Sequence, residues 1–214
     1  PQINAELKGR NIESTFVNGY RFTTDEIFDV VDKVLSKVVG PEVANNLILA
    51  GVNAQAISGK DSEVLFAEGI EGLGKVGRVI RVDVSSIDQL VEKKIVPVIA
   101  PIAIDVAGGT GLNINADLAA AAISGAYPDS TLIIMTDVAG IYRSWPDTSS
   151  LISSISYAEL DSMKSTFAEG MAPKVKACLD AIDGGASAVR IIDGTDPSAF
   201  AMALGNSGGT LVTK

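Results

Sequence analysis

Short apolar runs of strand type alternate with segments of helical periodicity along most of this 214-residue chain. Such alternation is typical of α/β proteins, because each helix covers the face of a sheet to which the next strand is added. The sequence therefore predicts an α/β fold with layers of helices around a largely parallel sheet. Strands are expected at 79–84, 95–102, 131–135, 188–192 and 210–213, and helices at 27–38, 41–49, 86–94, from residue 117, 157–163, 171–182 and 197–204.

The first of these helices has a clear start. Apolar residues recur at helical spacing from Ile27 to Val38, and the sequence Thr-Thr-Asp-Glu at 23–26 precedes them. Threonine side chains cap free backbone N–H groups, and acidic residues in a first turn suit the helix dipole. We therefore expect an amphipathic helix with a threonine cap.

The composition excludes several classes of protein. The formal net charge is -9 and the chain contains no histidine. Nucleic acid is disfavoured as a partner, since phosphate backbones bind clustered lysine and arginine. The lack of histidine removes Ser-His-Asp and Cys-His catalytic sites and His-containing zinc sites. The remaining groups suit phosphoryl transfer to a carboxylate, because that nucleophile is already ionised.

Neither a membrane segment nor a secretion signal is expected. The longest apolar region, 95–107, contains Pro97, Pro101 and Asp105 and is shorter than the roughly 20 residues that a membrane helix requires. The one cysteine, Cys178, falls in a helical pattern and is expected to be a small buried residue. These features predict a cytoplasmic protein with no membrane partner.

Polar residues gather where Asn-Ile-Asn-Ala-Asp at 113–117 runs into the apolar segment 118–122. A carboxamide at a helix entrance is compatible with a simple cap and equally with a ligand contact. Further polar residues favour the ligand contact, since Thr136 and Asp137 follow the apolar run 132–135, and ligands collect at the carboxyl ends of such strands.

Lys174 stands at the start of an expected helix, just after Pro173. A lysine there joins its charge to the free backbone amides, as a transferring phosphoryl group requires. A solvated surface lysine is the alternative interpretation. Asp137 has a similar alternative as a turn or cap residue. The serine-rich segment 142–154 is expected to be a mobile loop.

Two glycine-rich segments imitate nucleotide-binding motifs. Residues 72–77 form a literal Gly-x-Gly-x-x-Gly, but a strand-like run follows them rather than a helix. A hairpin or turn is therefore the better interpretation. Residues 108–111 lack the Gly-Lys-Ser/Thr ending of a phosphate loop and are expected to form a turn that leads to Asn113.

Several segments form an ordered set along the chain: 1–3, 17–21, 58–61, 113–117, 136–142, 170–175, 191–194 and 209–210. Together they resemble the acetylglutamate kinases of the amino-acid kinase family. The resemblance implies a three-layer α/β/α sandwich. It also implies an N-terminal lobe at 1–115 for the acid substrate and dimer contacts, and a C-terminal lobe at 116–214 for the nucleotide.

The resemblance implies roles for individual residues. Lys174 matches the lysine that stabilises the transferring phosphate, and Asp117 matches the aspartate that orients the catalytic lysines. Asn113 matches the residue that binds the acetylated amino acid, and Arg21 matches the arginine that clamps its carboxylate, a task suited to a planar guanidinium. The nucleotide would contact a short segment, with its aspartate near the phosphates or a metal: Thr136, Asp137, Gly140, Ile141 and Tyr142.

The activity implied by the resemblance is ATP-dependent phosphorylation of the side-chain carboxylate of N-acetyl-L-glutamate in arginine biosynthesis. ATP and Mg²⁺ would be the cofactors, and a homodimer or higher homo-oligomer would be the assembly. One alternative is a related kinase for a carrier-linked aminoadipate or glutamate, and another is a non-catalytic ligand-binding relative. Arg190 stands where the family commonly has a histidine, so feedback inhibition by arginine is not assumed.

In the resembled family, Pro-Gln-Ile follows a glycine triplet and an opening strand that ends in Lys-x-Gly-Gly. That strand supplies a second phosphate-stabilising lysine. The 214-residue sequence begins at Pro1, so we expect this chain alone to bind ligands weakly and to turn over poorly.

Overall fold

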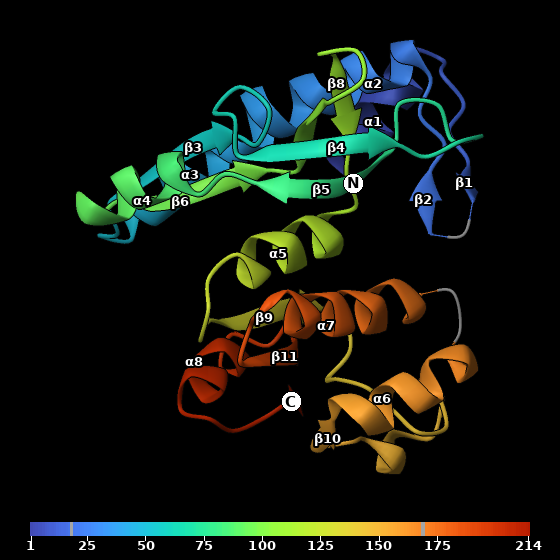
Figure 1. Cartoon of the computed structure of the whole chain (residues 1–214), viewed down its shortest axis with the longest axis vertical. Helices are drawn as coiled ribbons and strands as arrows, with labels where there is room; N and C mark the ends of the chain where they lie inside the picture. The colour runs from blue at the N-terminus through green and yellow to red at the C-terminus, as the bar shows by residue number, and fades with distance from the viewer. Residues whose placement is uncertain (18, 168–169) are drawn as a thin grey trace. The chain divides into compact units, whose positions relative to one another are not determined.

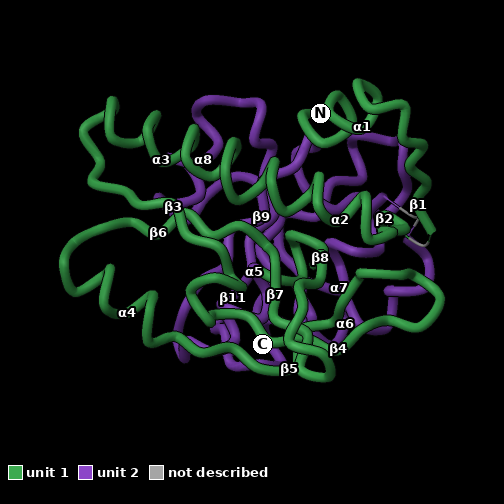
Figure 2. Tube along the Cα trace, turned by 90° about the horizontal axis from the view of Figure 1, so that it is seen from above, with its two compact units in different colours: residues 1–119 green, residues 120–214 purple. Residues whose placement is uncertain are grey.

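The computed structural model describes residues 1–17, 19–167 and 170–214 (Figure 1). The chain divides into two compact units, Pro1–Ala119 and Ala120–Lys214, which Figure 2 shows in separate colours. The division falls inside helix α5 (Ala116–Gly125). The functions assigned above to lobes 1–115 and 116–214 stay predictions.

The first unit places helices around short strands. Its helical elements, apart from the start of α5, are α1 (Gln2–Gly9), α2 (Asp25–Asp32), a π-helical segment (Lys33–Val39), α3 (Gly40–Leu49) and α4 (Ser85–Glu92). Its strands are β1 (Phe16–Val17), β2 (Tyr20–Arg21), β3 (Ala54–Ser58), β4 (Leu65–Gly69), β5 (Gly77–Val82), β6 (Val96–Ala100), β7 (Ile102–Asp105) and β8 (Gly111–Asn113).

Parallel pairs and hairpins both occur in this unit. β3 pairs with β6 in parallel, and the second sheet has the order β5-β4-β7-β8, in which β4 and β7 are parallel. The single strand expected at 95–102 is wrong, because β6 ends at Ala100 and β7 begins at Ile102 in a different sheet. Pro101 separates them; it has no N–H group to donate to a continuous ladder.

The threonine cap is confirmed, since Thr24 Oγ1 accepts a hydrogen bond from the backbone N–H of Ile27. The helix that follows is longer than expected, because the π-helical segment joins α2 to α3 without a break. Pro41 lies where the π-helical segment gives way to α3, and it has no N–H group to donate to the preceding turn. The buried core of this unit joins α1, α2, the π-helical segment and strand residues: Leu7, Ile27, Val30, Val31, Val34, Ala100 and Ile102.

Both glycine-rich segments form turns, as the sequence predicted. Residues 70–76 link the antiparallel strands β4 and β5, and Gly74 has a φ of 69° with no room for a Cβ atom against the carbonyl oxygen of Thr23. Residues 106–110 link the antiparallel strands β7 and β8, with Gly109 at a φ of 67°. Neither segment leads into a helix, so neither is a phosphate loop.

The second unit is a four-stranded sheet with helices from the segments between its strands. Its order is β10-β12-β11-β9, in which β9 and β11 are parallel, β10 and β12 are parallel, and β11 and β12 are antiparallel. Its elements, besides the end of α5, are β9 (Thr131–Thr136), β10 (Ser154–Ser156), α6 (Tyr157–Met163), α7 (Ala172–Gly184), β11 (Ala188–Asp193), α8 (Ala199–Leu204) and β12 (Thr210–Thr213), with 3-10 turns at Thr148–Ser150 and Lys164–Thr166.

The α/β class with parallel strand pairs is confirmed in each unit. Cys178 is buried on α7, as expected. No helix within the described part of the chain has the length and apolar character needed to cross a membrane.

Arg190 is a buried cation on β11, with 4% of its surface exposed. Its guanidinium donates to the carbonyl oxygen of Gly208 at 2.6 Å and to Asn206 Oδ1 at 2.7 Å, which fixes the turn before β12. We expect Arg190→Met to lower the free energy of unfolding by about 2 kcal/mol, because the turn loses two hydrogen bonds from a buried charged donor. Urea unfolding followed by tryptophan fluorescence measures this loss.

The matched control is Arg78→Met, which removes an exposed arginine paired with Glu68 at 3.5 Å. Exposed ion pairs contribute about 0 to 1 kcal/mol, so this variant should unfold close to the parent. Equal stability of the two variants would show that Arg190 does not hold the turn.

Candidate functional site

The second unit contains a cavity of about 640 Å³ at the end of strand β9. Several residues that the sequence singled out line it: Thr136, Asp137, Tyr142 and Lys174. Other lining residues were not predicted: Val138, Arg143, Ser144, Trp145, Thr166, Phe167, Gly170 and Met171. The structure thus gathers residues from the end of β9, the following loop and the start of α7 around one space.

Local structure explains how these side chains are placed. Thr136 ends β9, and its hydroxyl group donates to Asp137 Oδ1 at 3.1 Å, so the exposed carboxylate is oriented at the edge of the sheet. Lys174 lies in the first turn of α7, directly after Pro173, and is half-buried. The cavity therefore receives a lysine beside the first backbone amides of a helix, an arrangement that favours anions.

Gly140 and Ile141 are not among the residues that line this cavity. The buried backbone N–H of Ile141 donates to Thr210 Oγ1 at 2.8 Å, and Thr210 Oγ1 donates to the carbonyl oxygen of Ile152 at 2.6 Å. A Cβ atom at Gly140 would collide with the same hydroxyl group. These residues support the backbone that leads to Tyr142, and direct contact with a nucleotide stays a prediction for them.

Aromatic side chains form part of the cavity wall. Tyr142 and Trp145 meet edge to face with ring centroids 5.2 Å apart, and 64% of the Trp145 surface is exposed. Arg143 pairs with Glu159 at 2.7 Å. The mobility expected for 142–154 stays a prediction, but the segment supplies several of the lining residues that sequence reasoning missed.

The first unit brings Arg21 and Asn113 together. Both line a small cavity of about 120 Å³, with Phe16, Gly19, Tyr20, Val76, Ile114 and Asn115. The two residues are also linked through buried Thr23, whose hydroxyl group accepts from Asn113 Nδ2 at 3.2 Å and donates to the carbonyl oxygen of Arg21 at 2.7 Å. Arg21 and Asn113, which are 92 positions apart in sequence, therefore line the same cavity.

The guanidinium of Arg21 is held by neutral groups. Its terminal nitrogens donate to Ser14 Oγ and, at 2.8 Å, to Asn4 Oδ1, and it stacks over the Phe16 ring at 4.6 Å from the centroid. Within the described residues no carboxylate forms an ion pair with it. Burial lowers the pKa of Arg21 from its ordinary value. The charge is thus oriented but not neutralised.

The structure gives different roles to Asn113 and Asn115, for which the sequence allowed either a helix cap or a ligand contact. Asn115 is a cap, because its Oδ1 accepts from the backbone N–H groups of Asp117 and Leu118 at 3.0 and 3.3 Å. Asn113 makes no such cap contact, and its side chain bonds to Thr23 in the small cavity. Asp117 lies half-buried in the first turn of α5.

Comparison with known proteins decides the family. The amino acid kinase family model matches residues 1–193. The chain belongs to the amino acid kinase family. An acetylglutamate kinase of Arthrobacter sp. is 42% identical over 210 residues, which covers 92% of this chain and 68% of the relative. Another, from Corynebacterium urealyticum, is 39% identical over 217 residues, which covers 98% of this chain and 71% of that relative.

Solved structures share the fold of this amino acid kinase family member. The protein smu.665 from Streptococcus mutans UA159 superposes with a TM-score of 0.83 at 25% identity and covers 99% of this chain and 82% of its own. N-acetylglutamate synthase from Neisseria gonorrhoeae gives a TM-score of 0.82 at 20% identity over 99% of this chain and 49% of its own. The second likeness concerns the fold alone.

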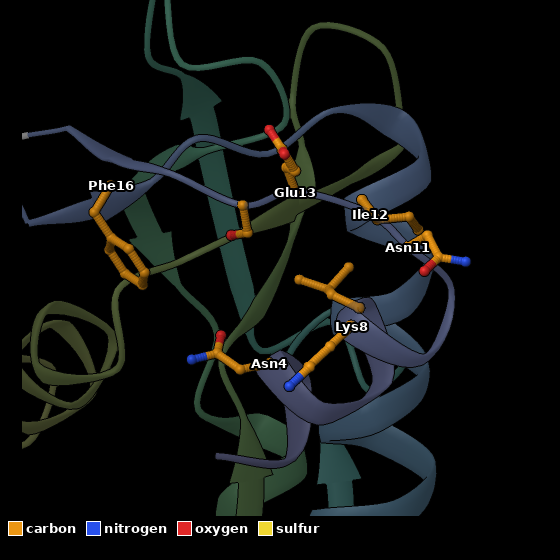
Figure 3. A pocket seen from close by; sticks show the side chains of 8 residues that line it. Asn4, Lys8, Asn11, Ile12, Glu13 and Phe16 are labelled. Atoms are coloured by element: carbon orange, nitrogen blue, oxygen red, sulfur yellow. The ribbon is translucent and has the colours of Figure 1, made fainter.

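A third cavity of the family member, about 440 Å³, lies beside helix α1 (Figure 3). Asn4, Leu7 and Lys8 come from α1, and Phe16 comes from β1. Asn4 and Ser14, the hydrogen-bond partners of Arg21, both line this cavity. Phe16 lines this cavity and the small one that contains Arg21 and Asn113. The side chains around Arg21 thus form a wall between two spaces of the first unit.

Proposed function

We propose that this amino acid kinase family member transfers the γ-phosphoryl group of ATP to the side-chain carboxylate of N-acetyl-L-glutamate. The observation that carries the proposal is its 42% identity, over 92% of the chain, to a relative named acetylglutamate kinase. Membership of the family alone would not select the acid. The proposal places the protein in arginine biosynthesis, in the cytoplasm, as a homodimer or higher homo-oligomer.

The cavity of the second unit suits a nucleotide. Its volume of about 640 Å³ lies in the range of small-molecule sites, and Tyr142 and Trp145 offer aromatic surface for a base. Lys174 and the first amides of α7 offer positive charge for the phosphates. Bound Mg·ATP would supply the phosphoryl group.

A magnesium ion that arrives with the nucleotide needs only one carboxylate ligand from the protein. Within the part of the chain that the structure describes, there is no cluster of three or more metal-binding side chains. Mg²⁺ bound to a nucleotide commonly takes only one or two carboxylates besides the phosphates. We assign Asp137 to that role, since it lies exposed in the wall of the same cavity.

The small cavity of the first unit suits the acid. We assign Arg21 to the α-carboxylate, because its charge is oriented and not neutralised. Asn113 donates its amide N–H to Thr23, which fixes the carboxamide and leaves its oxygen suited to the N–H of an acetamido group.

The reaction needs positive charge rather than a base. The γ-carboxylate of the acid is ionised at neutral pH and attacks without losing a proton. Lys174 is assigned to stabilise the charge that develops on the transferring group. Asp117, in the first turn of α5, is assigned the catalytic role that the family resemblance implies.

The test is acyl phosphate formation, trapped as the hydroxamate, on protein as the cell makes it and with its intact mass measured. The acids are N-acetyl-L-glutamate, L-glutamate, L-aminoadipate and a carrier-linked aminoadipate. Product confined to N-acetyl-L-glutamate is expected. Product confined to a carrier-linked acid would replace the proposal by the related kinase.

The chain contains one tryptophan, Trp145, and it lines the proposed nucleotide cavity. Its fluorescence should therefore change when Mg·ATP is added, and the change should saturate. Saturable binding without hydroxamate from any acid would contradict the proposal and favour a non-catalytic ligand-binding relative.

A further inference from the structure

The surroundings of Arg21 differ from those of the structural cations of the same unit. Lys60 forms an ion pair with Asp32 at 2.7 Å, and Arg10 pairs with Glu6 at 2.6 Å. Burial opposes the charge of Lys60, but the bond and charge of Asp32 raise its pKa above the ordinary value. Among the described residues, the guanidinium of Arg21 donates to the neutral oxygen atoms of Ser14 and Asn4, although Arg21 is half-buried.

Both ends and one face of the Arg21 guanidinium are fixed. Ser14 accepts from one terminal nitrogen, and Asn4 accepts from the other at 2.8 Å. Phe16 lies directly opposite Arg21 in the pairing of β1 with β2, which places its ring under the guanidinium. A guanidinium held in this way loses little further conformational entropy when it binds a carboxylate.

The partners are themselves held by the fold. Leu7, one turn after Asn4 on α1, is buried in the core against α2. The segment after α1 is tied back by the hydrogen bond from the N–H of Ile12 to the carbonyl oxygen of Leu7 at 2.9 Å. The position of Asn4 is therefore set by the core, and that of Ser14 by a short connection to it.

We propose that Asn4 and Ser14 are positioning residues that hold Arg21 through neutral oxygen atoms and so keep its full charge for the α-carboxylate of the substrate. This inference rests on the proposed function. The inference also predicts which residues can stand at positions 4 and 14 without weakening substrate binding. An acidic residue in place of either partner would keep a hydrogen bond but would compete with the substrate for the guanidinium.

Asn4→Asp tests this prediction, because it preserves the shape of the side chain and adds only a charge. The KM for N-acetyl-L-glutamate is expected to rise about tenfold, because the new carboxylate at hydrogen-bond distance competes with the substrate for the guanidinium. The α-carboxamide analogue, N-acetyl-L-isoglutamine, keeps the γ-carboxylate but has no charge at the α position, so its inhibition constant should change much less. The KM for ATP should stay near that of the parent.

The matched control is Asn11→Asp. Asn11 lines the same 440 Å³ cavity, is exposed, and is not one of the hydrogen-bond partners of Arg21. It adds the same charge nearby and should leave the ratio of acid to carboxamide affinity unchanged. Ser14→Ala is the second test and should also lower that ratio, through loss of orientation. Thermal unfolding of each variant reports whether it is folded.

The outcomes separate the two proposals. If the parent makes no acyl phosphate from N-acetyl-L-glutamate, the proposed function fails before any variant is tested. If the parent is active and Asn4→Asp weakens the acid and the carboxamide equally, or weakens neither, then Asn4 does not position Arg21 for a carboxylate and the inference is overturned.

Discussion

Replacing Lys174 with methionine is expected to lower the kcat of acyl phosphate formation by about 10²- to 10³-fold, the usual effect of removing one group that stabilises a transition state. The lysine lines the large cavity from the first turn of α7. Methionine keeps much of the length and the apolar stem but removes the charge. ATP binding should weaken far less, because the aromatic wall and the helix amides remain.

The measurement combines hydroxamate trapping with the fluorescence of Trp145. The control is Lys176→Met on the same helix, where an exposed lysine pairs with Asp180 at 2.6 Å. That variant should retain parental kcat. If Lys174→Met weakened ATP binding while kcat stayed parental, the lysine would act in ground-state binding and not in stabilising the transition state.

The parts of the fold that the sequence predicted well are those with strong local signals. The apolar run that became β9 and the periodic segment that became α7 carry their own patterns, so their chain positions were correct to within a few residues. Asp137 directly follows β9, and Lys174 lies in the first turn of α7. Their presence around one cavity follows from the parallel sheet, in which the carboxyl ends of neighbouring strands share an edge.

Residues that depend on contacts distant in sequence were missed. Asn4 meets Arg21 from 17 positions away, and α1 itself carries few apolar residues to mark it as a helix. The π-helical join of α2 to α3 was missed because Gly40 and Pro41 imitate a helix stop. Trp145 lies in a segment with no periodic pattern, so nothing local placed it in the cavity wall.

Thr210 illustrates the same limit in the second unit. In sequence it is one β-branched residue after a glycine pair, typical of a strand start. In the structure its hydroxyl group is fully buried and joins two chain segments, as acceptor for the N–H of Ile141 and donor to the carbonyl oxygen of Ile152. These contacts span 69 and 58 positions.

Thr210→Val is therefore expected to lower the free energy of unfolding by about 3 kcal/mol, since two buried backbone groups lose their partner while the shape is kept. Thr210→Ser retains the hydroxyl group and should lose much less, and Thr213→Val on the same strand should stay within about 0.5 kcal/mol of the parent. Urea unfolding followed through Trp145 measures the stability of all three variants.

Thr210→Val should also weaken the fluorescence response to Mg·ATP under conditions where the variant is folded. The reason is that Thr210 holds Ile141, and the next residue, Tyr142, lines the cavity. An unchanged nucleotide affinity in folded Thr210→Val would show that the segment from Gly140 to Tyr142 does not depend on this hydroxyl group for its role in the site.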